Sequence, residues 1–398
     1  MDRRNFLTGV TALGAALTSG VGVLHAPAFA QGTAGAARDA STYDRLLILV
    51  ELKGANDGLN TFVPYGDAAY YGLRPTIGIK RDQMLQVSEQ YGLHPSLEPL
   101  LPLWKQGEMA AVMGLGYREP NLSHFRSIEI WDTGSNARDY LGEGWLARAF
   151  AAVTPPKAFV ADGIAVGGGE LGPFAGGHRA LSIASTDAFI RQARLADPHG
   201  RASNDALQHI LRLEGEAQSA ALNINPKLTL KSDFPTHGFG QQCKTAMQVV
   251  AASPGVAALR VGLGSFDTHQ GQLGTQQALL KQLAEGIAAM KGALVEMNRW
   301  RNTTIVTYCE FGRRAKENQS AGTDHGTANT QFVLGGAVKG GLYGAHPSLT
   351  QLSGDGNLIY TTDYRQLYAT LLTEWWGFNA AQSERVLGGR FAALPVFG

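Results

Sequence analysis

Six short apolar runs recur along the chain and alternate with stretches of helical periodicity. In the first run, residues 45–52, five apolar residues follow one another from Leu46 to Val50. Polar residues do not alternate with them, as they would in a strand with one face in water. Such a run is typical of a strand buried on both faces, as in a parallel sheet. The other five runs span residues 109–115, 158–166, 257–263, 303–308 and 331–334.

Helical patterns fill the spaces between these runs. The longest predicted helix spans residues 276–300, and the last spans 363–376, with Thr362 or Asp363 as its N-cap and Gly377 at its end. Strands that alternate with helices predict a doubly wound α/β fold, with a mostly parallel central sheet and helices on both faces. The glycine-rich stretch 167–177 is expected to be a surface loop over the sheet.

The N-terminus has the features of an export signal. Arg3 and Arg4 form a pair followed by apolar residues, and no charge occurs from residue 7 to residue 24. This pattern is typical of a signal read by the twin-arginine translocase, which would be a partner during export. Small residues flank Phe29, so we expect cleavage after Ala30 and a periplasmic or secreted protein. The alternative is a single membrane anchor.

The signal sets the expected domain organisation. Residues 1–30 are the signal peptide, residues 31–42 a flexible tether rich in small residues, and residues 43–398 a single domain without stable membrane insertion. Without Asp2, Arg3 and Arg4, 32 basic and 32 acidic side chains remain from the 34 and 33 of the whole chain. This balance gives no support for binding to nucleic acid, which usually requires a basic excess.

Carboxylates and imidazoles follow the predicted strands, where open parallel sheets bind their ligands. These residues are Asn56 and Asp57 after the first run, Asp267 and His269 after the fourth, Glu310 after the fifth, and Asp324 with His325 shortly beyond. Carboxylate oxygen and imidazole nitrogen are ligands for Zn²⁺ or Mn²⁺, and a carboxylate-rich cluster also suits Mg²⁺ or Ca²⁺. The sequence therefore predicts a site for one or two divalent metal ions at this edge of the sheet.

Each residue also has a purely structural alternative. Asn56 and Asp57 stand before a glycine and could form a turn, and Asp267 could cap a helix that begins near Gly271. Asp324 could belong to a hydrogen-bonded turn. The two cysteines, Cys243 and Cys309, could form a disulfide in the periplasm or remain as buried thiols.

Three further residues could act beside a metal ion. Ser123 is expected at a helix N-terminus, where it could be an activated nucleophile or an ordinary N-cap. His124 could reach the metal site or be a packed histidine. Arg313 could bind an anionic group of a substrate, or begin a solvated helix together with Arg314.

Motifs along nearly the whole predicted domain resemble those of the DUF1501 family, whose function is unassigned. The motifs occur in the family's order: Gly54 to Thr61 with Arg74-Pro75, Ser123-His124-Phe125 with Trp131-x-Thr133-Gly134, Phe266-Asp267-Thr268-His269, Glu310-Phe311-Gly312-Arg313, Gly322-Thr323-Asp324-His325-Gly326, Gly340-Gly341-x-Tyr343-Gly344 and Thr362-Asp363-Tyr364-Arg365. The resemblance implies an exported protein with the fold of the alkaline phosphatase and sulfatase superfamily.

Members of that superfamily bind two metals at their strand ends. The resemblance implies metal ligation by Asp57, Asp267, His269, Asp324 and His325, with Ser123 near the position of the nucleophile. The spacing Asp267-x-His269 is shorter than the superfamily's Asp-x-x-x-His, and the nearest candidate for the last histidine ligand is His346.

The leading hypothesis is an exported metal-dependent hydrolase that acts on a phosphate or sulfate ester. The substrate would be a small-molecule or polymer anionic ester, Ser123 would attack it, and Arg313 would stabilise its anion. The alternative is a non-catalytic secreted protein that uses the metal for structure or partner binding. A redox enzyme is a third hypothesis, disfavoured because no cysteine joins the cluster.

Overall fold

A computed structural model describes residues 40–195, 203–224, 229–253 and 255–398. The predicted signal peptide and all but the last residues of the predicted tether lie outside this part of the chain. The described residues belong to one compact unit that runs from residue 39 to the C-terminus. No helix in the described ranges is long and apolar enough to cross a membrane.

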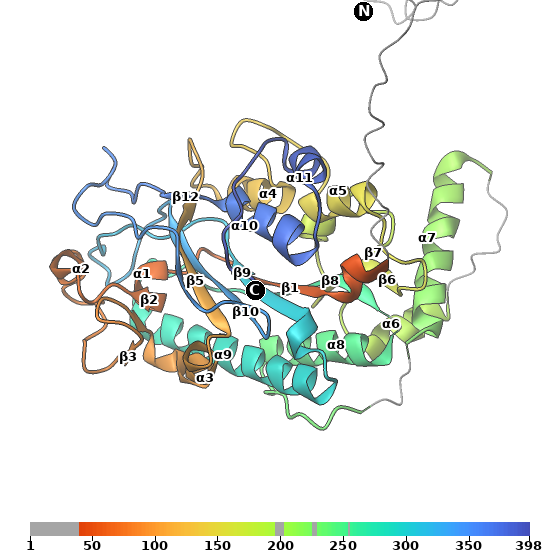
Figure 1. The fold of residues 1–398 in the computed structure, drawn as a ribbon, viewed down its shortest axis with the longest axis horizontal. Helices are drawn as coiled ribbons and strands as arrows, with labels where there is room; N and C mark the ends of the chain where they lie inside the picture. Colours follow the sequence, from red (N-terminus) through yellow and green to blue (C-terminus); the bar gives the residue numbers. More distant parts are fainter. Residues whose placement is uncertain (1–39, 196–202, 225–228, 254) are drawn as a thin grey trace, which may run out of the picture. The chain divides into compact units, whose positions relative to one another are not determined.

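A mixed sheet of nine strands forms the centre of the described unit (Figure 1). Its order is β11-β5-β10-β9-β1-β8-β6-β7, and β12 pairs with β5 outside this path. The strands are β1 (Leu46–Leu52), β5 (Met109–Gly116), β6 (Ala161–Val166), β7 (Ala180–Ile183), β8 (Val256–Leu263), β9 (Thr303–Tyr308), β10 (Asn329–Gly335), β11 (Gly341–Tyr343) and β12 (Thr362–Asp363).

Strand β1 lies in the middle of the sheet and is buried along its whole length. It pairs in parallel with β8 on one side and β9 on the other. Strand β10 is antiparallel to both of its neighbours, β9 and β5. The remaining pairs are parallel, so the predicted mostly parallel sheet is confirmed.

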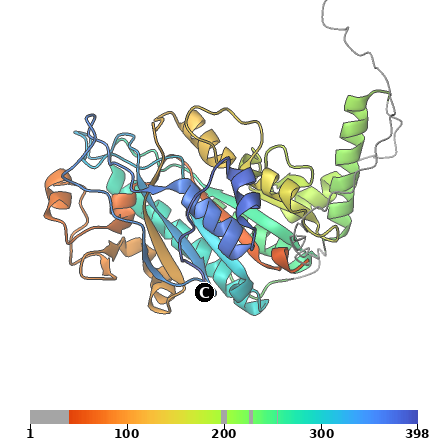
Figure 2. The same ribbon diagram turned by 45° about the horizontal axis from the view of Figure 1, so that its top comes forward.

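Two hydrophobic cores lie on opposite faces of the sheet, because successive side chains of a strand point to opposite sides. Ile48 and Val50 belong to one core, and Leu47 and Leu49 to the other. Helices α8 (Gly238–Ala252) and α9 (Gln272–Glu296) cover the first face. The second face is covered by α4 (His124–Thr133), α5 (Trp145–Ala152), α10 (Tyr364–Thr370) and α11 (Ala380–Leu387), as Figures 1 and 2 show. The predicted double winding is therefore confirmed.

Shorter elements complete the fold. The other helices are α1 (Gly58–Thr61), α2 (Ala68–Leu73), α3 (Leu101–Lys105), α6 (Thr186–Ala193) and α7 (Asp205–Leu222). A second sheet has the order β2-β4-β3, from Phe62–Val63, Gly92–Leu93 and Leu85–Gln86. Short 3-10 helices occur at Ala40–Asp44, Pro95–Leu100, Gly172–Phe174 and Trp300–Asn302, and a π-helix at Leu371–Trp375.

Helix α9 begins four residues before its predicted start and also ends earlier, at Glu296. The first turn was missed because its buried residues are polar. Gln272 and Gln276 both lie inside the protein, where their side-chain amides donate to Asp57. Such positions do not contribute to an apolar pattern, and the prediction from hydrophobic periodicity therefore starts too late.

The C-terminal helical segment follows the prediction more closely. Asp363 is the N-cap of α10, and its side chain forms a capping box with Gln366. The chain then continues as the π-helix and turns at Gly377, whose φ of 70° is in the left-handed region. The predicted loop 167–177 is only partly a surface loop, because Phe174 is fully buried in the second core. Both cysteines are free and buried.

Buried His94 makes the stability of this fold dependent on pH. The side chain is 3% exposed, and its Nδ1 accepts a hydrogen bond from the amide of Ser96. Burial lowers the pKa of His94 from 6.5 to about 4. The unfolded chain therefore takes up a proton below pH 6.5 that the folded chain does not, and stability falls as the pH falls from there towards 4.

We predict that acidification from pH 7.5 to 5 destabilises the wild type by about 2 kcal/mol more than His94→Asn. Asparagine keeps an acceptor for the Ser96 amide but cannot take up the proton. Urea unfolding of both proteins at the two pH values measures the difference. Equal acid sensitivity of the two proteins would show that His94 does not control it.

Candidate metal centre

The loops after β1, β8 and β9 meet at the carboxyl edge of the sheet. Gly54 lies in the first loop with a φ of 98°, and a Cβ there would stand 2.6 Å from the amide nitrogen of Asp267. Only glycine allows both this backbone conformation and this approach. In the second loop, Ser265 has a φ of 79°, a strained value for a residue with a side chain. The two loops are thus held unusually close together.

Three histidines and one aspartate converge where these loops meet. The Nε2 atom of His325 is 3.0 Å from Nε2 of His124, 3.0 Å from Nε2 of His269 and 3.2 Å from Oδ1 of Asp267. Asp267 also lies 3.0 Å from Nε2 of His269 and 3.4 Å from Nε2 of His124. We call these four residues the histidine cluster.

The hydrogen bonds on the far side of the imidazoles indicate where their lone pairs point. Nδ1 of His325 is 2.9 Å from the carbonyl oxygen of Leu122. A carbonyl can only accept, so this nitrogen carries the proton and Nε2 of the neutral ring is left with a lone pair. In the same way, Nδ1 of His124 is 2.8 Å from Oε1 of Glu310. The Nε2 lone pairs of these two rings therefore face each other inside the cluster.

This arrangement fits a divalent metal ion. Two facing lone pairs repel unless a proton or a cation lies between them. A histidine whose outer nitrogen donates to a carboxylate or carbonyl is the usual form of a metal-ligating imidazole. His124, Asp267 and His325 offer ligand atoms that all lie within 4.8 Å of one another, and His269 lies beside them. Imidazole and carboxylate together are a ligand set for zinc and other transition metals. The residues present thus meet the requirements of a metal site.

The metal-site prediction placed Asp267, His269 and His325 at this edge, and the structure brings all three together. His124 was a possible additional ligand and is a full member of the cluster. Asp324 lies outside the cluster, on the far side of His269, with its Oδ1 3.4 Å from Nδ1 of that ring. A hydrogen bond from Asn318 and the nearby His269 lower the pKa of this exposed carboxyl. Its position is that of an outer residue that orients His269.

Glu310 is also an orienting residue. Its side chain is buried, and Oε1 accepts a 2.8 Å hydrogen bond from the amide of Gly54 as well as facing His124. The hydrogen bond to Glu310 raises the pKa of His124, which burial opposes. Glu310 therefore connects the first loop to the cluster.

Arg313 occupies a different position from the one predicted. Its side chain is fully buried, and its N–H groups bind backbone carbonyl oxygens and Asp267. The carbonyl acceptors are Ala55 at 2.8 Å, Thr323 at 3.0 Å, Phe266 at 3.0 Å, and Gly54. The guanidinium thus fastens three loops together, and this geometry does not support the predicted contact with an anionic substrate.

Arg313 also acts on Asp267, through a 2.6 Å bond to Oδ1. Burial disfavours the charged form of Asp267, but the hydrogen bond and charge of Arg313 outweigh it and lower the pKa of this carboxyl. Asp267 is therefore held as a carboxylate, the form in which it can bind a metal. The alternative role of Asp267 as a helix cap is wrong, because the N-cap of α9 is Gly271.

Asp57 does not join the cluster. Its Oδ2 accepts from Nη1 of Arg74 and from the amide of Gln272, both at 2.5 Å, and Oδ1 accepts from the amide of Leu59. Both carboxylate oxygens and the negative charge are therefore already satisfied. Asp57 therefore lies outside the cluster, and Arg74 supplies its cationic partner, so this geometry gives no support to its predicted role as a metal ligand.

The two remaining candidates also lie outside the cluster. Asn56 is buried, where its side chain binds Thr61 and Gln276. His346 has Nδ1 2.8 Å from the carbonyl oxygen of Pro347, and its ring packs against Tyr91. Both have structural roles.

Ser123 is exposed at the N-terminus of α4, directly between Leu122 and His124. It is the N-cap residue, but its side chain makes no capping hydrogen bond. The contact between Leu122 and His325 holds this segment against the cluster. Ser123 therefore belongs to a segment that is held against the cluster, and its side chain is not used to cap the helix.

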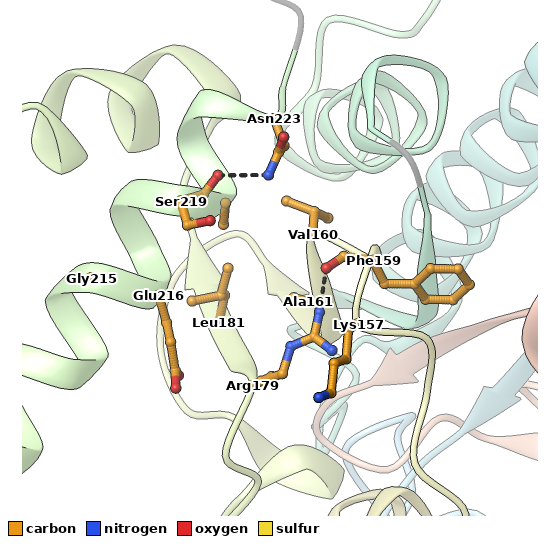
Figure 3. A pocket seen from close by; sticks show the side chains of 11 residues that line it. Lys157, Phe159, Val160, Ala161, Arg179, Leu181, Gly215, Glu216, Ser219 and Asn223 are labelled. Atoms are coloured by element: carbon orange, nitrogen blue, oxygen red, sulfur yellow. Dashed lines mark hydrogen bonds between the residues drawn. The ribbon is translucent and has the colours of Figure 1, made fainter.

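A cavity of about 360 Å³ adjoins the cluster. We call it the trough, and it is lined by Glu51, Lys53, Gly54, His124, Phe125, Ile128, Asp132, Glu170, Arg260, Ser265, Asp267 and Glu310. Another cavity, of about 340 Å³, lies between α7 and the first residues of β6 (Figure 3). Its Arg179 is bound to the carbonyl of Phe159 and paired with Asp162, and none of the predicted site residues lines it.

We predict that His325→Ala weakens Zn²⁺ binding at least about 100-fold, because it removes the nitrogen at the centre of the cluster. Asp57→Asn should retain the affinity, since Asp57 is bound to Arg74. Isothermal titration of the metal-free proteins measures both, and His346→Ala is the matched histidine control. Loss of binding in Asp57→Asn but not in His325→Ala would contradict the assignment.

A second prediction concerns Arg313. Arg313→Leu should lower the free energy of unfolding by about 3 kcal/mol or more, because it leaves buried carbonyls and Asp267 without their partner. Arg314→Leu, at the neighbouring half-buried position, should cost less than about 1 kcal/mol. Urea unfolding of the metal-free proteins compares them. Similar losses of unfolding free energy in both variants would contradict the role of Arg313 in holding the loops together.

Comparison with known proteins places the chain in a family. No curated protein matches it. Solved structures align over most of the chain at low identity. Ps i-CgsB in complex with k-i-k-neocarrahexaose is 10% identical, with a TM-score of 0.42 and coverage of 87% of this chain and 74% of that one. The soluble domain of lipooligosaccharide phosphoethanolamine transferase A from Neisseria meningitidis is 9% identical, with a TM-score of 0.39 and coverage of 87% and 93%.

An alkaline phosphatase from the Antarctic bacterium TAB5 is 11% identical, with a TM-score of 0.33 and coverage of 73% of this chain and 91% of that one. The family comparison is more specific. The model of DUF1501, described as a protein of unknown function, matches residues 44–387. This range contains every member of the histidine cluster and all nine strands of the central sheet. The chain therefore belongs to the DUF1501 family.

Proposed function

We propose that this protein is an exported metal-dependent hydrolase of a phosphate or sulfate ester. The observation that carries the proposal is the histidine cluster, in which the Nε2 atoms of His124, His269 and His325 converge with Asp267 beside an open cavity. Export through the twin-arginine translocase, and hence a periplasmic or secreted location, belongs to the same proposal and is supported by Arg3 and Arg4.

The cluster would hold one divalent metal ion. Three imidazoles favour a transition metal such as zinc over Mg²⁺ or Ca²⁺, which prefer oxygen ligands. A second ion would need further carboxylates, but Asp57 is paired with Arg74. When bound, a divalent metal supplies Lewis-acid chemistry, because it polarises an ester oxygen and lowers the pKa of a nearby hydroxyl.

Ser123 would be the nucleophile. Its Oγ would form a bond to phosphorus or sulfur as the bond to the alcohol oxygen breaks, and the leaving alcohol would take up a proton. Water would then displace the serine oxygen and release phosphate or sulfate. The exposed, uncapped position of Ser123 supports this role, since an N-cap serine normally binds the helix amides.

The N-terminus of α4 would stabilise the anion in place of Arg313. The amides of His124, Phe125 and Arg126 are the first of the helix and have no intrahelical partner. They are not capped by the serine side chain, and the helix dipole favours a negative charge at this end. An anionic ester beside Ser123 would thus meet amide donors on one side and the metal on the other.

We predict that zinc-loaded protein hydrolyses p-nitrophenyl phosphate or p-nitrophenyl sulfate. Ser123→Ala should lower kcat at least about 10³-fold, because it removes the attacking oxygen. Zinc content should stay at the wild-type level, since the side chain is not a ligand. Release of p-nitrophenol is followed by absorbance, and Ser88→Ala, at an exposed serine in a distant loop, is the matched control.

Turnover in Ser123→Ala at the wild-type rate would exclude the nucleophilic role. Absence of turnover of both esters by fully metal-loaded wild type would contradict the hydrolase and leave a non-catalytic metal-binding protein.

A further inference from the structure

The trough extends from the histidine cluster along one face of helix α4. His124, Ile128 and Asp132 are spaced four residues apart, so their side chains lie in a row on that face. His124 belongs to the cluster, and Asp132 is therefore two helical turns further from it. A substrate held at the cluster can thus extend its other part along α4 towards Asp132.

The inner wall of the trough is built from buried polar residues. Glu51 at the end of β1, Arg260 on β8 and Asp132 on α4 are 3%, 6% and 9% exposed. Arg260 is ion-paired with Glu51, and its Nε donates a 3.0 Å hydrogen bond to the hydroxyl of Tyr308. That hydroxyl donates in turn to Oδ1 of Asp132 at 3.2 Å. A continuous network therefore connects the three elements.

This inner wall has hydrogen-bonding groups but little net charge. The charge of Arg260 is balanced by Glu51, and burial raises the pKa of Asp132 to about 8, which Arg260 opposes. Burial therefore favours the uncharged form of Asp132. Within the described ranges, Oδ2 of Asp132 and Oε1 of Glu51 have no hydrogen-bond partner, so the network has capacity left for a ligand.

The mouth of the trough has a different character. Phe125 follows His124 on α4 and is 87% exposed, although it is a large apolar side chain. It lines the same cavity as the buried polar residues. An exposed aromatic ring beside a polar cavity offers a flat surface on which a ring of a ligand can stack.

We propose that the trough binds the alcohol part of the ester, and that this part is an uncharged, hydroxyl-rich ring such as a sugar. The proposal rests on the proposed function, because it assumes that the cluster holds the phosphate or sulfate group. The apolar face of the ring would stack on Phe125, and its hydroxyls would bind Glu51, Arg260 and Asp132.

Other classes of alcohol fit this cavity less well. An alkyl chain would leave the oxygens of Glu51 and Asp132 buried without hydrogen bonds, which is costly. A second anionic group would need an unpaired cation, but Arg260 is bound to Glu51 and Lys53 lies 3.6 Å from the same carboxylate. A cationic group would need an unpaired buried carboxylate, but Glu51 already has Arg260 and burial disfavours the charged form of Asp132. Glu170 is exposed to solvent at the rim.

The test compares esters that differ only in the remote part of the alcohol. The hexose 6-phosphates of glucose, galactose and mannose, n-hexyl phosphate and phosphocholine are all esters of primary alcohols, and the matching sulfates are used if sulfate is the preferred anion. At least one hexose ester should exceed n-hexyl phosphate and phosphocholine in kcat/KM by about tenfold or more, the value of one well-made hydrogen bond.

Phe125→Ala should lower kcat/KM for the preferred hexose ester about 3- to 10-fold, as expected for the loss of one stacking contact, and leave n-hexyl phosphate less affected. Because Phe125 is exposed, its removal should not affect folding. Tyr140→Ala is the matched control, since Tyr140 is 76% exposed and does not line the trough. It should leave all rates unchanged.

Failure of this proposal is distinguishable from failure of the proposed function. Turnover of p-nitrophenyl esters without any preference for a hexose ester, or a kcat/KM for the preferred hexose ester that Phe125→Ala does not lower, would overturn the sugar assignment alone. If no ester is hydrolysed, saturation-transfer NMR with free glucose, galactose and mannose decides. Binding that Phe125→Ala abolishes and Tyr140→Ala preserves would support a sugar-binding trough, and absence of binding would overturn it.

Discussion

The candidate site depends on one buried guanidinium. Arg313 donates to carbonyl oxygens in the loops after β1 and β8 and in the segment before His325, and it also binds Asp267. Buried carbonyls need donors, and a single rigid side chain with five N–H groups supplies them for several loops at once. Without it, the strained backbone at Ser265 and the close approach at Gly54 would have no common support.

The fold and the site are connected through this edge of the sheet. Parallel strands β1, β8 and β9 end together, so their following loops are brought to one place by topology alone. Helix α4 adds what the strands do not supply. It contributes His124 to the cluster, an uncapped N-terminus beside Ser123, and a wall of the trough. A metal, an anion and an alcohol group could thus be bound along one helix.

Much of this arrangement could be predicted from the sequence. Continuous apolar runs predicted the buried strands, and Asp267 and His269 follow the end of β8 within six residues. His325 lies further along, 17 residues after the end of β9. The antiparallel direction of β10 could not be predicted, because an apolar run carries no information about strand direction. The polar first turn of α9 was missed because its glutamines are buried through hydrogen bonds.

The differences between the predicted site and the observed contacts have the same physical origin. Asp57 has the position of a ligand in the sequence, but its partner Arg74 is 17 residues away and is brought to it only by folding. Arg313 was expected to face an anion because it stands beside the predicted metal site. Its burial among backbone carbonyls leaves no pattern in the sequence, so its structural role could not be predicted. The trough also depends on packing, since Glu51, Asp132 and Arg260 come from three separate elements.

The central claim is that the histidine cluster holds a metal ion. Anomalous X-ray diffraction at the zinc absorption edge, from crystals of zinc-loaded protein, tests it most directly. The account predicts one strong anomalous peak among His124, His269, His325 and Asp267, and none beside Asp57. A peak at Asp57, or no peak at the histidine cluster in protein shown to contain zinc, would contradict it.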